Sequence, residues 1–97
     1  MGTLESRLPG PITVASALAA GEQVFRERGW TILRQESSLD RGFVLAQAPD
    51  SSFVESVQLS AQTNATGGTH VRLRVDPLGN RELTTNLFDS VLEKLGL

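Results

Sequence analysis

Residues 56–62, SVQLSAQ, and residues 70–76, HVRLRVD, decide the fold, because each stretch alternates polar and apolar side chains with the period of a β-strand. A glycine-containing turn joins them, and pairing Thr63 with Thr69 sets the register of the hairpin. The apolar residues then meet in three pairs: Ala61 with Val71, Leu59 with Leu73, and Val57 with Val75. All these side chains face one way, so the sequence predicts an antiparallel hairpin with one buried face.

An amphipathic helix is predicted on either side of the strands. Apolar residues recur at helical spacing from residue 13 to about residue 28, where Thr13 is a typical N-cap and Gly29 suits the position after the last turn. Asn80 is a typical N-cap for a second helix, which runs to about Leu95. Its apolar stripe consists of Leu87, Phe88, Val91, Leu92 and Leu95.

A further hairpin is predicted between the first helix and residue 56. Residues 30–36 and 43–48 are rich in β-forming side chains and flank a polar turn at residues 37–42. The predicted strands follow one another through short loops, which favours antiparallel pairing. We therefore expect an α+β fold with two layers, a four-stranded antiparallel meander with the N-terminal and the C-terminal helix packed on one face.

The length and composition fit one globular domain. The chain has 97 residues, of which 39% are hydrophobic and 21% are charged. Residues 1–12 show no periodicity and include Pro9 and Pro11, so we interpret them as a flexible leader or tether. Residues 13–97 are then the single α+β domain.

The charge and residue usage argue against several classes of function. Nine Lys and Arg against eleven Asp and Glu give a net charge of −2, which provides no basic footprint for nucleic acid. Cysteine is absent, and His70 has neither a second histidine nor a neighbouring carboxylate in the sequence to complete a metal or catalytic site. We expect a non-enzymatic protein with no metal and no cofactor.

One candidate interaction surface is apolar and belongs to the first hairpin. Both faces of the strand at residues 43–48 carry apolar side chains, and only one face can pack against the helices. Leu33, Phe43 and Leu45 are therefore a candidate surface for a protein partner or for self-association. The alternatives are that the proline-containing leader covers these side chains, or that they are tolerated in water.

A second candidate is the polar face of the central hairpin. His70, Arg72 and Arg74 project from the same face as Gln58 and neighbouring polar residues, and could bind a small anionic ligand or a glycan. The alternative is an ordinary solvated sheet face.

The residues Gly29-Trp30-Thr31-Ile32, the turn Asp40-Arg41-Gly42, and then Val44 and Ala46 resemble a pattern found in small bacterial envelope lipoproteins of uncharacterised function. The order of elements is similar to that of the helix–sheet domains of the barrel-assembly lipoprotein BamC. Such a resemblance implies an envelope domain that acts through protein–protein contacts.

The first residues add to this resemblance. Met1-Gly2-Thr3-Leu4 is similar to the segment that follows the lipidated cysteine of such proteins, with Met1 in the place of that cysteine. The sequence departs from the pattern because it contains no Cys. The resemblance implies a membrane-anchored protein of the bacterial periplasm, held by a lipid ahead of Gly2. The alternative is a small cytoplasmic oligomer with Met1 as its natural start.

Overall fold

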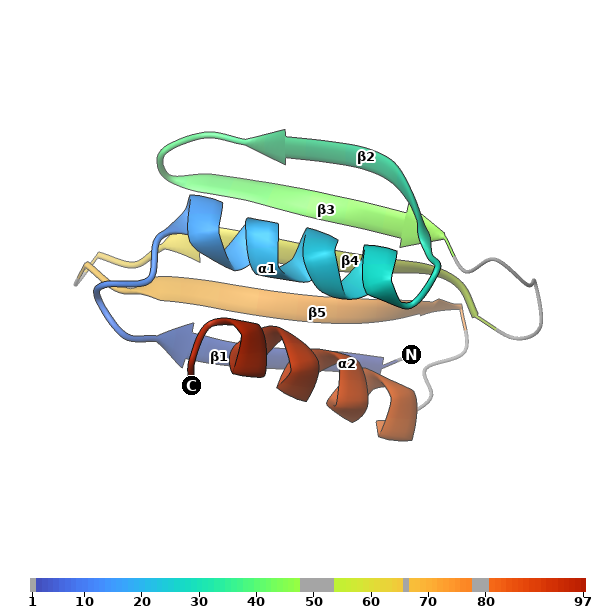
Figure 1. Ribbon diagram of the computed structural model, residues 1–97. Coiled ribbons are helices and arrows are strands. Elements are labelled where there is room, and N and C mark those ends of the chain that lie inside the picture. The colour runs from blue at the N-terminus through green and yellow to red at the C-terminus, as the bar shows by residue number, and fades with distance from the viewer. Residues whose placement is uncertain (1, 48–53, 66, 78–80) are drawn as a thin grey trace.

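Two layers make up the fold, an antiparallel sheet and a pair of helices that cover one of its faces (Figure 1). The computed structural model describes residues 2–47, 54–65, 67–77 and 81–97. Within these ranges, five strands lie in the order β1-β5-β4-β3-β2. The strands are β1 (Gly2–Leu8), β2 (Thr31–Ser37), β3 (Arg41–Gln47), β4 (Val54–Thr63) and β5 (Thr69–Pro77), and the helices are α1 (Val14–Glu27) and α2 (Arg81–Lys94).

The central hairpin of β4 and β5 has the predicted register. Thr63 lies opposite Thr69, and the three predicted apolar pairs are all present. The side chains of these pairs are buried, with at most 3% of their surface exposed. The helices cover this face, so the hairpin forms the floor of the hydrophobic core.

The helices also agree with the sequence. Thr13 caps α1, because its hydroxyl accepts a hydrogen bond from the backbone N–H of Ser16 at 3.1 Å while the Ser16 hydroxyl accepts one from the N–H of Thr13 at 2.9 Å. Gly29 follows α1 with a φ of +78°, a conformation that glycine adopts without steric cost. The predicted cap Asn80 lies outside the described residues. No helix in the described ranges is long and apolar enough to span a membrane.

The sheet has a fifth strand, which corrects both the expected four-stranded meander and the expected flexible leader. Residues 2–8 pair with β5 along their whole length, from Gly2 opposite Val75 to Leu8 opposite Thr69. Leu8 belongs to the core and Leu4 packs against it, while Glu5 and Arg7 alternate to the other face. The prolines that suggested a tether begin only at Pro9, where the strand ends.

Close approach of α1 to the sheet depends on Gly21. A Cβ atom at this position would collide with the side chain of Leu59 in β4, which is itself fully buried. The missing side chain therefore lets α1 lie directly over the central strands.

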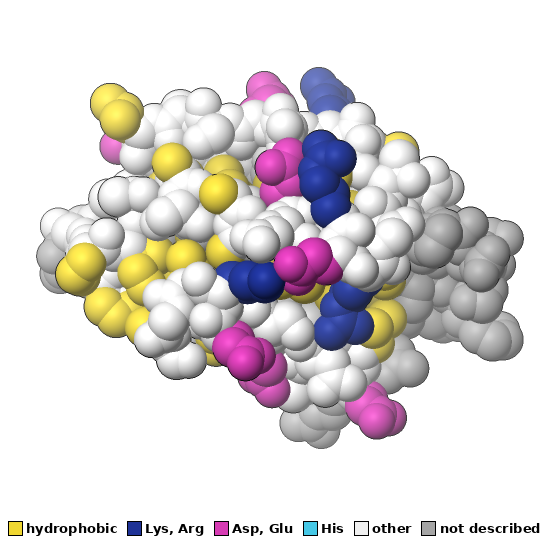
Figure 2. Space-filling model, viewed as in Figure 1, with side chains coloured by type: hydrophobic (Ala, Val, Ile, Leu, Met, Phe, Trp, Pro, Cys, Tyr) yellow, Lys and Arg dark blue, Asp and Glu magenta, His cyan; other side chains and the backbone are white. Residues whose placement is uncertain are grey.

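The two helices contact each other through polar side chains. Lys94 Nζ donates a hydrogen bond to Glu27 Oε2 at 2.9 Å, and Arg28 Nη2 donates one to Ser90 Oγ at 3.2 Å. The hydrogen bond from Lys94 and the charge of its ammonium group hold the pKa of the Glu27 carboxyl below its usual value. Figure 2 shows the side of the molecule that the helices cover, where cationic and anionic side chains lie next to one another over its centre.

The burial of Leu8 leads to a test of β1. Leu8→Ala should lower the free energy of unfolding by about 2–5 kcal/mol, because it removes a buried side chain and leaves a cavity. Urea denaturation measures the change. Leu39→Ala is the control, since Leu39 is 94% exposed and its truncation should change stability by less than about 0.5 kcal/mol. Equal small effects of both substitutions would show that residues 2–8 are a tether.

The contact between Glu27 and Lys94 leads to a test by titration. Lys94→Met should return the pKa of Glu27 towards its usual value, as measured by NMR of the carboxyl carbon. Because the pKa is lower in the folded state, the pair stabilises the fold above the unfolded-state pKa and loses this effect as the pH falls through the folded-state pKa. Arg26→Met is the control on the same helix. An equal shift of Glu27 in both variants would contradict the assignment to Lys94.

Candidate functional site

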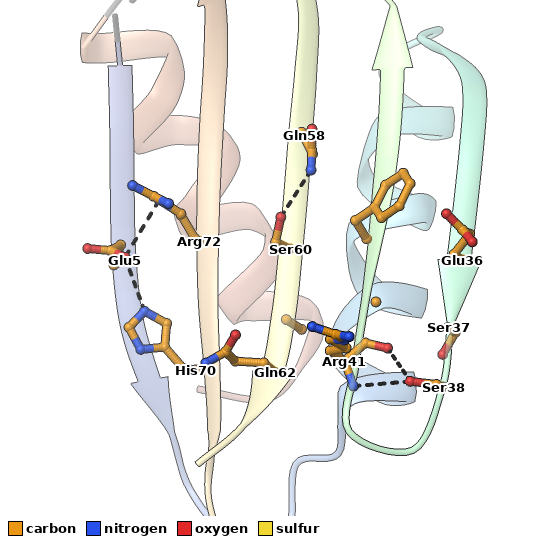
Figure 3. Close-up of a pocket in the computed structure, with 13 residues that line it drawn as sticks. Glu5, Glu36, Ser37, Ser38, Arg41, Gln58, Ser60, Gln62, His70 and Arg72 are labelled. Carbon is orange, nitrogen blue, oxygen red and sulfur yellow. Dashed lines mark hydrogen bonds and ion pairs between the residues drawn. The ribbon is translucent and has the colours of Figure 1, made fainter.

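The sheet face opposite the helices, which we call the open face, is the candidate site. Its side chains alternate with the buried ones, so the strands that build the core also build this face. Its residues form rows across the sheet, and one row consists of Glu5, Arg72, Ser60, Phe43 and Glu36. A concavity of 610 Å³ lies over this row and the next one towards the turns. Figure 3 shows the labelled side chains along this part of the face.

A carboxylate from β1 lies close to a histidine and an arginine of β5. Glu5 Oε1 lies 3.3 Å from His70 Nε2 and 3.6 Å from Arg72 Nε (Figure 3). No carboxylate lies near His70 in the sequence, so residues close in the chain could not reveal this contact. The pairing of β1 with β5 supplies Glu5 from 65 residues away.

The predicted ligand residues share the open face with the outward-facing polar residues of β4. His70 lies opposite Gln62, Arg72 opposite Ser60, and Arg74 opposite Gln58. Gln58 Nε2 donates a hydrogen bond to Ser60 Oγ at 3.2 Å. His70 and Arg72 line the concavity, whereas Arg74 lies outside it. The face thus offers amide, hydroxyl and guanidinium groups within a few strand spacings.

The predicted apolar surface is divided by the structure. Phe43 and Leu45 lie on the open face of β3 and are partly buried, while Val44 and Ala46 face the core. Leu33 is 51% exposed and lies where a bulge interrupts the pairing of β2 between Ile32 and Arg34. Phe43 and Leu45 are therefore together, and Leu33 stands apart from them at the sheet edge.

Charged residues of β2 and β3 complete the concavity and were not among the predicted site residues. Glu36 of β2 lies opposite Phe43 of β3, and Arg41 is at the start of β3, beside the turn that contains Ser38. Arg41 occupies the same row as Gln62 and His70. The alternation of residues 41–47 is the signal that could have placed Arg41 on the face with Phe43 and Leu45.

The concavity carries charged side chains of both signs. Its lining contains two carboxylates, Glu5 and Glu36, and two guanidinium groups, Arg41 and Arg72, besides His70. Among the described residues, no group of three or more His, Cys, Asp or Glu side chains could hold a metal ion. What the lining offers is a mixture of hydrogen-bond donors and acceptors around the ring of Phe43.

Comparison with protein-family models found no match, and comparison with curated protein sequences found none either.

Proposed function

We propose that this protein is a non-enzymatic binding domain that engages a partner protein with the open face of its sheet. The observation that carries the proposal is that no element of the described chain covers this face, although Phe43 and Leu45 lie on it side by side along β3. A two-layer domain needs only one apolar sheet face. Apolar side chains on the second face are typical of a contact surface.

The shape of the site favours a macromolecule over a small ligand. Pockets for small molecules enclose most of the ligand surface within largely apolar walls. Here the concavity is open along the sheet, and its walls carry Glu5, Arg41 and Arg72. An aromatic centre surrounded by hydrogen-bonding and charged groups is the usual arrangement of a protein interface.

Site-specific photo-crosslinking in the source cells tests this proposal. A photoreactive residue at Gln58 or Gln47 on the open face should give the same discrete adduct, whereas one at Gln23 on α1 should give none. Leu45→Asp should abolish the adduct from Gln58 and leave the circular dichroism spectrum of a folded domain, because Leu45 lies outside the buried core.

Two results would contradict the proposal. One is an adduct from Gln23 that equals those from the open face. The other is an unfolded Leu45→Asp variant, which would place Leu45 in the core rather than on a contact surface.

The alternative ligand is a small anionic molecule or a glycan, which the hydrogen-bonding groups around Phe43 would suit. Charge reversal separates the two hypotheses. Arg72→Glu combined with Arg74→Glu should abolish binding of an acidic oligosaccharide, followed by NMR shifts of the amides of β4 and β5. Contact through Phe43 and Leu45 should survive the same change.

We also propose, from the resemblance at residues 29–46, that the domain works at the bacterial cell envelope as a lipoprotein. An anchor joined ahead of Gly2 would hold the domain at the start of β1, opposite Val75. The concavity lies towards the other end of the strands, near His70 and Arg41, so it would lie away from the membrane surface.

Mass spectrometry of the mature protein, expressed from its natural gene with and without an inhibitor of lipoprotein processing, tests the location. We expect an acylated cysteine immediately ahead of Gly2. An unmodified chain that starts at Met1 would contradict the envelope assignment and favour a cytoplasmic domain.

A further inference from the structure

The two edges of the sheet differ in how well they can accept another strand. β1 is regular, since all its residues from Gly2 to Leu8 pair with β5 without a break. β2 is interrupted by the bulge at Leu33, so its longest uninterrupted pairing with β3 covers only Arg34–Ser37. Bulges hinder edge-to-edge pairing, whereas a regular edge strand presents unpaired backbone groups to a further strand.

We propose that β1 pairs in antiparallel fashion with β1 of a second copy of this chain, with Ser6 opposite Ser6 at the twofold axis. The two sheets then become one continuous sheet, and the interface is the same on both subunits. This proposal does not depend on what the open face binds.

The charges of β1 select this register. With Ser6 on the axis, Glu5 of each copy lies opposite Arg7 of the other on the open face, which gives two cross-strand ion pairs. If one copy of β1 slides along the other by two residues, Glu5 lies opposite Glu5, or Arg7 opposite Arg7. Like charges directly opposite each other are destabilising. Sliding by one residue brings core-facing side chains opposite outward-facing ones.

The charged groups are available for these pairs. Arg7 makes no ion pair or side-chain hydrogen bond within the described part of the chain. The contacts of Glu5 with His70 and Arg72 both involve Oε1. Glu5 Oε2 can therefore accept from the second copy's Arg7 while the contacts within the subunit remain.

The apolar side chains of β1 match in the same register. Leu4 lies opposite Leu8 of the second copy on the helix side of the sheet. Leu4 is only partly buried in the single chain, although it packs against the core. Its pairing with the second copy's Leu8 would remove more of this apolar surface from water.

Helix α2 supports the same arrangement. It contacts both β1 and β5, so two copies of α2 would run side by side across the axis. Ser90 and Lys94 point towards α1, and helical geometry puts the partly buried Leu92 on the opposite flank, above the β1 edge. Leu92 of each copy would therefore add to the apolar part of the interface.

Analytical ultracentrifugation of the full chain over a range of concentrations tests the proposal. The wild-type protein should form dimers, and Arg7→Glu and Glu5→Arg should each raise the dissociation constant by about tenfold or more, because each places like charges opposite one another. An equimolar mixture of these two variants should associate about as tightly as the wild type. In the mixed dimer, the two carboxylates on β1 of one chain face the two guanidinium groups on β1 of the other. Arg34→Glu, the matched charge change on β2, should have no effect.

Hydrogen exchange provides a backbone measurement that needs no variant. Outward-facing amides of β1 should exchange more slowly as the protein concentration rises, while those of β2 should not change. A chain that stays monomeric at the highest attainable concentration overturns the proposal. So does a dimer that Arg7→Glu leaves intact, or one that Arg34→Glu weakens instead, which would assign the interface to β2. If Glu5→Arg does not fold, Arg7→Glu and the exchange measurement decide the question alone.

Discussion

The pairing of the apolar side chains of β4 with those of β5 is the interaction on which the rest of the structure depends. These strands lie inside the sheet, where β1 pairs with β5 and β3 pairs with β4. Burial of a Val or Leu side chain contributes about 1.5–3 kcal/mol, and a slip of one residue would turn all of them into water. Helices α1 and α2 then pack on the one face that this register makes apolar.

The same constraint explains why the open face is polar and chemically mixed. A strand whose odd residues enter the core must present its even residues on the other side, as Gln58 and Ser60 do in β4. β3 differs because Phe43 and Leu45 replace polar residues at these outward positions. The fold does not require apolar side chains there, so these two residues are the ones in β3 that favour the proposed contact surface.

Local patterns were sufficient to predict the elements with strong periodicity, but not the neighbours that long-range pairing supplies. The register of β4 with β5, the cap of α1 at Thr13 and the stop at Gly29 all follow from residues close in the sequence. β1 has only Leu4 and Leu8 as inward apolar residues, and its partner strand is the most distant one in the chain. Without β1, neither the Glu5 contact with His70 nor a regular sheet edge could be foreseen.

Three sets of contacts constrain β1: one in the core, one on the open face and one at the end of the strand. Leu8 fills the core, and Glu5 takes part in the open face. The end of the strand is held in place as well, because the buried Thr69 hydroxyl donates a hydrogen bond to the carbonyl of Ile12 at 2.6 Å, just before α1 begins. Arg7 belongs neither to the core nor to the lining of the concavity, so it is the position in β1 at which the proposed association can change while Leu8 and Glu5 are kept.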